Sequence, residues 1–224
     1  RNSTGKSTIL GVLANSGELK KKDGTTYSDG QFRAEFSEIF HGSKKYDASG
    51  SDRIQIDIVD ENDNKIDYRK FRTAWQNDNG RDRFRVIPLK LLDGGKKTEA
   101  KMQIPVLYLG LSRLFPIGEA NEDKITTNKI KFIDDEQKKW FIEQYAKILS
   151  LYDTVTDVSN YSIGETDKKK GVGIETDKYD YLTNSSGQDN LGQILMSILS
   201  FKRLKKQREE WTGGLLLIDE IDAT

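Results

Sequence analysis

The first eight residues, R-N-S-T-G-K-S-T, have the types and order needed to bind a polyphosphate. Gly5, Lys6 and Ser7 match the second half of the phosphate-loop pattern GxxxxGK[ST], whose first Gly would stand one position before Arg1. Backbone N–H groups of such a loop, and the positive end of the helix that follows, point at phosphates. Lys6 would lie against the β- and γ-phosphates, and the Ser7 hydroxyl would bind Mg²⁺. The candidate nucleotide-binding residues of this segment are Asn2, Ser3, Thr4, Gly5, Lys6, Ser7 and Thr8.

A second motif, at the other end of the sequence, ends an apolar run with two acids. Gly213 and Gly214 precede four aliphatic residues, and Asp219 and Glu220 follow these directly. The run predicts a buried parallel strand, and ligands in open α/β sheets collect at the carboxyl ends of strands. Asp219 is suited to bind Mg²⁺, and Glu220 is suited to polarise an attacking water. The two motifs together predict a site that binds ATP with Mg²⁺ and hydrolyses it.

A third motif, N-S-S-G-Q at residues 184–188, opens an amphipathic stretch that leads to the acidic strand. It resembles the signature motif LSGGQ of ABC-type ATPases, with Asn184 in place of Leu and Ser186 in place of the first Gly. In that family the signature residues bind the γ-phosphate of a nucleotide held by a second protomer. The resemblance places this role on Ser185, Gly187 and Gln188. Without the other two motifs, S-S-G-Q would be an ordinary N-cap before a core helix.

Composition sets limits on the class of protein. The 224 residues could bury a sizeable core, and 32% of them are charged. No apolar run approaches the roughly 20 residues that cross a bilayer, and no signal peptide is visible. The absence of cysteine excludes disulfides and thiolate metal sites, and 36 basic against 36 acidic residues give no global argument for nucleic acid. We expect a cytoplasmic protein without membrane contact.

Periodicity predicts the elements that position the motifs. Residues 7–15 have helical spacing, with Ile9, Leu10, Val12 and Leu13 facing a core. Residues 53–92 alternate in the β manner between turn-forming segments, which predicts an antiparallel meander. Residues 105–111 carry no charge and predict a central strand, and residues 134–151 predict a helix that begins with acids.

These elements give an expected fold and domain organisation. We expect an α/β fold, a P-loop NTPase of the ABC-ATPase type, with a mainly parallel core sheet, an antiparallel β meander and a helical lobe. Residues 1–224 would form part of such a domain, starting inside the phosphate loop (Walker A) and ending just after the acidic strand (Walker B). The β subdomain would span residues 53–92. The helical lobe, which carries the signature motif, would span residues 118–204.

One departure from the family pattern and two basic clusters complete the chemistry that the sequence offers. ABC-type ATPases have a glutamine loop after the strand at 105–111, and this sequence has Ser112-Arg113 there. Arg113 could sense the γ-phosphate, anchor the lobe or form a structural salt bridge. The first basic cluster comprises Arg81, Arg83 and Arg85. The second comprises Lys202, Arg203, Lys205, Lys206 and Arg208. Both could contact DNA phosphates, but interleaved acids are more typical of solvated faces.

The resemblance extends to a narrower group. The ending D-E-I-D-A-T, the run S-S-G-Q-D-N-L-G-Q-I-L and a β-rich insertion without a long coiled coil look like the bacterial defence ATPases related to the overcoming-lysogenisation-defect and Septu (PtuA) proteins. The resemblance implies an ATP-sandwiched homodimer, with Glu220 as the catalytic residue, that acts as a switch for a nuclease effector directed at DNA. Two alternatives remain: a module that ATP clamps around DNA or a partner with negligible turnover, and a loader or remodeller of the AAA+ class, for which D-E-I-D is also suited.

Overall fold

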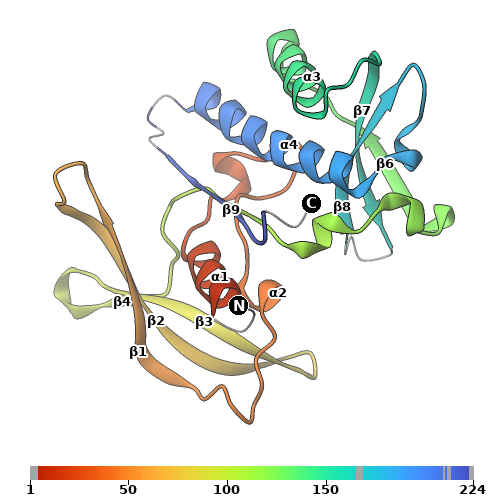
Figure 1. Cartoon of the computed structure of the whole chain (residues 1–224). Coiled ribbons are helices and arrows are strands. Elements are labelled where there is room, and N and C mark those ends of the chain that lie inside the picture. Colours follow the sequence, from red (N-terminus) through yellow and green to blue (C-terminus); the bar gives the residue numbers. More distant parts are fainter. Residues whose placement is uncertain (1–4, 165–168, 209, 211–212, 222–224) are drawn as a thin grey trace. The chain divides into compact units, whose positions relative to one another are not determined.

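The computed structural model describes residues 5–164, 169–208, 210 and 213–221, which form two compact units (Figure 1). The first unit comprises Arg1–Lys20, Phe32–Tyr108 and Gly213–Leu217. The second comprises Lys21–Gln31, Leu109–Thr212 and Ile218–Thr224. Both units are therefore assembled from segments that are distant in the sequence.

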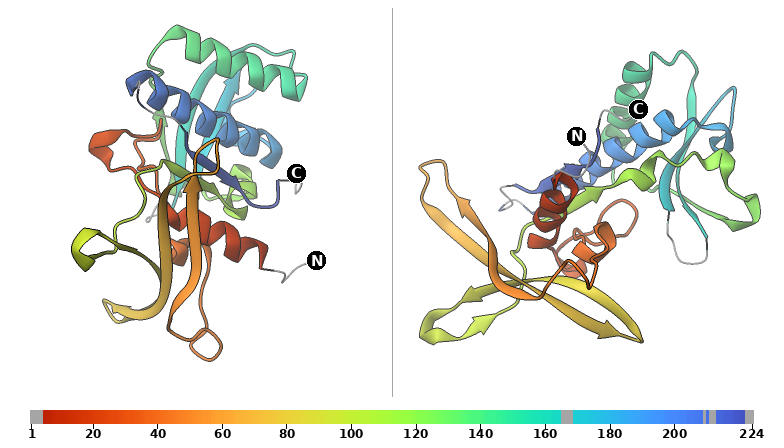
Figure 2. Two further views of the ribbon diagram at one scale, coloured as in Figure 1. Left: turned by 90° about the vertical axis from the view of Figure 1, so that its left-hand side faces the viewer. Right: turned by 60° about the horizontal axis from the view of Figure 1, so that its bottom comes forward.

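A four-stranded antiparallel sheet in the order β1-β2-β3-β4 dominates the first unit (Figure 2). Its strands are β1 (Gly50–Val59), β2 (Lys65–Asp78), β3 (Arg81–Leu91) and β4 (Lys97–Thr98). Asn79 and Gly80 both have positive φ, 50° and 79°, which gives the two-residue turn that suits a twisted hairpin between β2 and β3. The meander expected over residues 53–92 thus starts slightly earlier, and β4 extends it after the turn η2 (Asp93–Gly95).

Two short helices, α1 (Lys6–Ser16) and α2 (Phe36–Ile39), cover one face of this sheet. Val12 and Phe36 pack against three sheet residues, Phe71, Phe84 and Val86. Gly11 is buried against Phe36, and a side chain would not fit easily there, because a Cβ would lie 3.2 Å from the ring carbons of Phe36. The expected apolar face of α1 was therefore wrong in part: Val12 is buried, but Ile9 is 62% exposed.

A single parallel strand pair was found among the residues that the structure describes. β5 (Val106–Leu109) pairs with β9 (Leu215–Ile218), and the N–H groups of Leu215 and Asp219 donate to Pro105 and Leu109. Val106 and Leu215 pack with Ala14 of α1 in a small apolar cluster. The two larger sheets are antiparallel, so the mainly parallel core sheet expected from the sequence is represented here by two strands. The P-loop fold itself stays a prediction.

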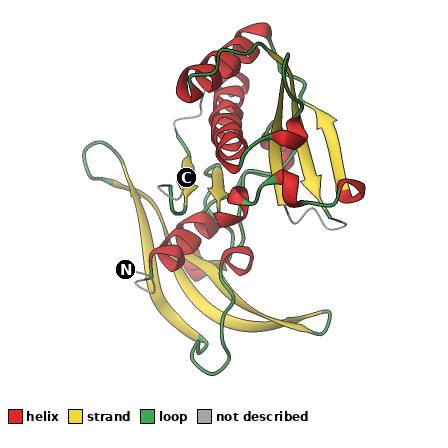
Figure 3. Cartoon of the chain, turned by 45° about the vertical axis from the view of Figure 1, so that its right-hand side comes forward, coloured by secondary structure: helices red, strands yellow, loops and turns green. Residues whose placement is uncertain are grey.

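The second unit combines an antiparallel sheet with two helices (Figure 3). The sheet, in the order β6-β7-β8, comprises β6 (Ile125–Lys129), β7 (Val155–Ile163) and β8 (Lys169–Thr176). The helices are α3 (Asp135–Leu149) and α4 (Ser186–Gln207). The 3-10 turns are η1 (Lys21–Asp23), η3 (Leu111–Leu114), η4 (Ile117–Glu119), η5 (Glu122–Lys124) and η6 (Tyr181–Thr183). The lobe expected over residues 118–204 as helical therefore contains a three-stranded sheet as well.

α4 is the longest described helix, with 22 residues, and it lies against β8. Gly192 permits this approach, since a Cβ at that position would lie 3.2 Å from the Cβ of Val172. Phe141, Tyr145, Ile174 and Leu199 form the centre of the resulting core, and each is completely buried. Across the described part of the chain, no helix has the length and apolar character to span a membrane.

Candidate functional site

The phosphate-loop residues occupy the N-terminus of α1. Gly5 is the N-cap, with a left-handed backbone (φ 81°, ψ 7°), and no side chain caps the helix there. Lys6 and Ser7 are exposed, Thr8 is half-buried, and the first turn contains no acid. A helix N-terminus of this kind attracts an anion through its backbone N–H groups and its dipole. Asn2, Ser3 and Thr4 lie outside the described residues.

The two acids follow the carboxyl end of β9, whose four residues are half-buried, where the sequence predicted a buried strand. Asp219 is 5% exposed, and its N–H donates to Leu109 O at 3.0 Å. Glu220 is half-buried and has φ 48°. A left-handed conformation is uncommon for a residue with a Cβ, and it persists only where the surrounding structure fixes it. Glu220 is therefore held in an orientation that its own backbone preference would not select.

Arg113, in the turn η3, contacts the Glu220 backbone. The residue is 2% exposed, and its guanidinium donates to Glu220 O at 2.8 Å and to Asn190 Oδ1 at 2.7 Å. It also donates to the carbonyl oxygens of Leu109 and Gly110, at 3.3 and 3.1 Å. Of the roles offered by the sequence, the contacts favour anchoring, because these partners are atoms of the protein itself.

Asn190 and Asp189, which the sequence analysis did not single out, complete this arrangement on α4. Asp189 is fully buried, and its carboxylate accepts from Val172 N at 3.0 Å and from Gln193 Nε2 at 3.1 Å. Burial, and next the negative charge of Asp189, raise the pKa of the Tyr161 phenol, which stays neutral. The sequence offered one weak signal for them, the presence of two adjacent polar residues in an amphipathic helix. At least one of such a pair normally faces solvent, whereas both are buried here.

The signature-like residues form the N-terminus of α4 as a reciprocal cap. Ser185 Oγ accepts from Gln188 N at 3.2 Å, and Gln188 Oε1 accepts from Ser185 N at 2.8 Å. A hydroxyl carries one donor and two acceptor positions, so the Ser185 O–H proton is not consumed by this cap. Around Gly187 the space is open, because a Cβ there would meet only Ser185 Oγ, at 4.0 Å. The ordinary N-cap interpretation thus describes the observed geometry, and it leaves a donor for a ligand.

The basic cluster on α4 is largely engaged inside the second unit. Lys202 lies 3.6 Å from the ring centroid of Trp140, and Arg203 lies 5.2 Å from that of Tyr27. Lys206 pairs with the carboxylates of Asp134 and Glu136. Arg208 Nη1 donates to Asp23 O at 3.4 Å. These contacts give the cluster a structural role.

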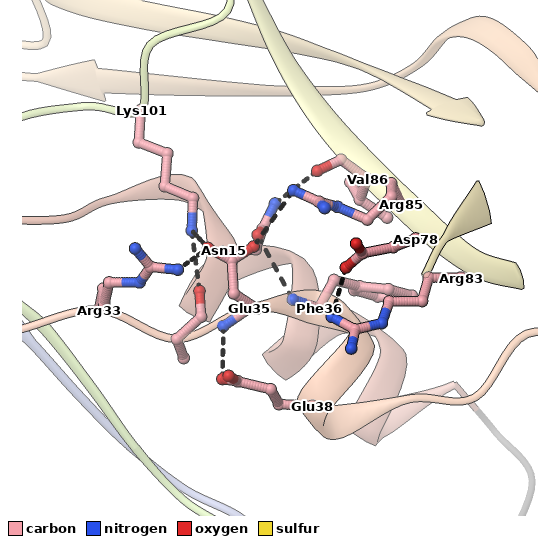
Figure 4. A network of polar contacts seen from close by, with 11 residues as sticks. Asn15, Arg33, Glu35, Phe36, Glu38, Asp78, Arg83, Arg85, Val86 and Lys101 are labelled. Atoms are coloured by element: carbon pink, nitrogen blue, oxygen red, sulfur yellow. Dashed lines mark hydrogen bonds and ion pairs between the residues drawn. The ribbon is translucent and has the colours of Figure 1, made fainter. Parts of the chain in front are cut away.

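Two arginines of β3 are also paired, within the first unit (Figure 4). Arg83 lies 3.4 Å from Asp78, and Arg85 lies 3.8 Å from Glu35. Glu35, the N-cap of α2, also forms ion pairs with Arg33 and Lys101. The distances from its Oε1 to Arg33 Nη2 and Lys101 Nζ are 2.6 and 3.1 Å. Internal partners therefore account for two of the three arginines of the first basic cluster.

The described side chains that could bind the expected Mg²⁺ are few. No group of three or more His, Cys, Asp or Glu residues that could bind a metal was found in the described ranges. Mg²⁺ at a nucleotide needs fewer protein ligands, because the phosphates and water complete its octahedron. Asp219, which is buried, and Ser7, which is exposed, each carry hard oxygen atoms of the kind that this ion prefers, so their donor chemistry suits it.

The structure thus sorts the predicted residues into two sets. Gly5 to Thr8 belong to the first unit, and the signature-like and acidic residues belong to the second, where Arg113 joins α4 to the end of β9. Comparison with protein-family models, with curated proteins and with solved structures finds no match to this chain.

Proposed function

We propose that this chain is an ABC-type ATPase that binds ATP with Mg²⁺ and hydrolyses it to ADP and phosphate. The observation that carries the proposal is the end of β9, where two adjacent acids follow a parallel strand and the buried Arg113 donates to the Glu220 carbonyl. A hydrolytic carboxylate must keep one orientation, and a hydrogen bond from a rigid guanidinium limits the movement of the residue that carries it.

The residues have distinct roles in this proposal. Lys6 opposes the charge of the β- and γ-phosphates, and the first backbone N–H groups of α1 bind their oxygens. Ser7 and Asp219 would hold Mg²⁺, which when bound supplies positive charge to the phosphates. Glu220 accepts a hydrogen bond from the attacking water and orients it towards the γ-phosphate.

The second part of the proposal is a nucleotide-dependent homodimer. Ser185, Gly187 and Gln188 would face the γ-phosphate bound by a second copy, so that two ATP molecules become part of the interface. The support is local: the capped N-terminus of α4 keeps the Ser185 hydroxyl proton as a donor. The dimer would act as a cytoplasmic switch for a DNA-directed effector such as a nuclease, in bacterial antiviral defence.

Two substitutions in the full-length protein test the ATPase. Lys6→Ala should weaken Mg-ATP binding about 10- to 150-fold, as expected for losing a hydrogen bond to a charged group. Glu220→Gln should bind ATP like the parent and lose at least about 100-fold in turnover, since the amide keeps its size and lacks the charge. Lys20→Ala and Glu210→Gln are matched controls, because both side chains are exposed.

The outcomes separate the alternatives. ATP binding that depends on Lys6, together with equal turnover in Glu220→Gln and its parent, would remove Glu220 from catalysis. Lys6-dependent binding with no turnover in the parent would favour the ATP-clamped module. Binding that is the same in Lys6→Ala and Lys20→Ala would refute the nucleotide site.

A further inference from the structure

Arg113 is an unusual core residue, because it buries a charge where an apolar side chain would suffice for packing. Taking a guanidinium out of water is costly unless its N–H groups find partners in good geometry. Here Nε donates to Asn190 Oδ1, Nη2 donates to Glu220 O, and Nη1 donates to the carbonyls at the end of β5. One planar group therefore joins three separate segments of the second unit.

The two shortest of these bonds connect the elements that matter for hydrolysis. Asn190 lies in α4, little more than one turn after the N-cap Ser185. The Glu220 carbonyl belongs to the residue whose carboxylate is the proposed water ligand. Since the guanidinium is planar and rigid, a shift of Asn190 must either move the Glu220 peptide or break a buried hydrogen bond.

The α4 end of this linkage is itself braced. Gln193 Nε2 donates both to Arg113 O, at 3.4 Å, and to Asp189 Oδ2, at 3.1 Å. Asp189 in turn accepts from Val172 N of β8. Asn190 therefore moves with α4 as a whole.

We infer that Arg113 is a positioning residue that transmits the state of the α4 N-terminus to the Glu220 backbone. This inference rests on the proposed function for its catalytic meaning. When the α4 N-terminus engages a γ-phosphate on a second copy, the Asn190–Arg113–Glu220 connection sets the orientation of the Glu220 carboxylate. Hydrolysis then depends on dimer formation through named hydrogen bonds within one unit.

The first measurement needs no nucleotide. Asn190→Ala removes the acceptor on α4 and leaves Arg113 and Glu220 in place. We expect amide hydrogen exchange of residues 213–221 in the full-length protein to become about tenfold faster or more, because a hydrogen bond to a charged group biases a local equilibrium by at least that factor. Ser197→Ala is the matched control, since its buried hydroxyl donates only to Gln193 O within α4.

The second measurement separates positioning from mere structure. Asn190→Ala should lower kcat about tenfold or more with the KM for ATP unchanged, and Asn190→Asp, which keeps an oxygen acceptor for Arg113, should restore both kcat and slow exchange. Arg113→Lys should behave like Asn190→Ala, because an ammonium cannot reach both partners in one plane.

The outcomes decide the inference independently of the ATPase. Exchange at residues 213–221 that is equal in Asn190→Ala and Ser197→Ala would overturn the linkage. Faster exchange in Asn190→Ala, rescued by Asn190→Asp, would support it even if the parent showed no Lys6-dependent hydrolysis, a result that would refute only the proposed function.

Discussion

The N-termini of α1 and α4 were both predicted to face phosphate, and the structure forms them in two different ways. The N-cap of α1 is Gly5, which offers no side-chain acceptor, and the first turn holds Lys6 and no acid. The N-cap of α4 is Ser185, which forms a reciprocal cap with Gln188, and the first turn holds the buried Asp189. The side-chain cap of α4 satisfies N–H groups at its own N-terminus, whereas Gly5 offers no side-chain acceptor to those of α1.

The difference suggests a division of labour. α1 would supply the positive charge and the backbone donors that bind a nucleotide. α4 would present a preformed terminus with one hydroxyl donor, suited to recognising a phosphate that another protomer already holds. The same short motif type thus predicts primary binding in one case and recognition in the other.

The largest expected effect comes from placing a negative charge on the α4 cap. Ser185→Asp keeps a good N-cap residue but should repel the γ-phosphate of a second copy. In the Glu220→Gln background with Mg-ATP, we expect ATP-dependent association to fall at least about tenfold, measured by light scattering, with unchanged ATP affinity for each protomer. Ser185→Thr, which keeps cap and hydroxyl, is the control. Equal association of the two variants would make S-S-G-Q a helix cap alone and favour the AAA+ alternative.

An intermediate effect should distinguish the two glycines. Gly5→Ala should destabilise the start of α1 by about 1–2 kcal/mol, because its φ of 81° is unfavourable for alanine. Gly187→Ala should stabilise the protein by about 0.4–1 kcal/mol, because it lies in a helix with open space around the new Cβ. Chemical denaturation of both variants measures these opposite signs. A destabilised Gly187→Ala protein would contradict the described backbone at that position.

The smallest effect tests a third helix N-terminus, that of α3. Hydrogen bonds from Gln137 N, and then from Lys206, lower the pKa of Asp134 below its ordinary value of 3.8. Because the pKa of Asp134 is lower in the folded protein, the stability that its carboxylate contributes is fully present above pH 3.8. This stability is lost as the pH falls through the folded-state pKa.

Asp134→Asn keeps the cap and removes the charge. We expect a slightly lower Tm than that of the parent at pH 6, and a smaller difference at pH 3, which is below the ordinary pKa. Asp135→Asn, at the exposed neighbouring position, is the control. A Tm difference between parent and Asp134→Asn that is the same at both pH values would show that the carboxylate charge is not involved.

Local patterns predicted the elements better than their partners. The acids at the start of α3, the alternation in the meander and the Asn79-Gly80 turn are each encoded by neighbouring residues, so the sequence was sufficient. The buried face of α1 could not be predicted in this way, because Gly11 and Ala14 are buried by Phe36 and Val106, which are distant in the sequence. Periodicity alone favoured the larger Ile9.

The candidate site shows the same limit. The phosphate-loop and acidic residues are contiguous in sequence and could be singled out. Arg113, Asn190 and Glu220 meet only in the folded second unit, and single residues scattered over such distances leave no spacing to detect. The β6-β7-β8 sheet inside the expected helical lobe was not predicted. Polar residues and glycines in residues 155–163 and 169–176 weaken the apolar alternation that marks a strand.

The interleaving of the two units has a consequence for synthesis on the ribosome. β5 is synthesised long before β9, its partner. The hydrogen bond from the Arg113 guanidinium to the Glu220 carbonyl cannot form until β9 has been made. At roughly 5–20 residues per second, the intervening segment takes on the order of 5–20 seconds to appear. During that interval Val106 and Tyr108 lack the apolar surface of Leu215 and Leu217, and the edge of β5 is unpaired. The nascent chain therefore exposes apolar surface and an unpaired strand edge, the features that chaperones bind, until β9 is made.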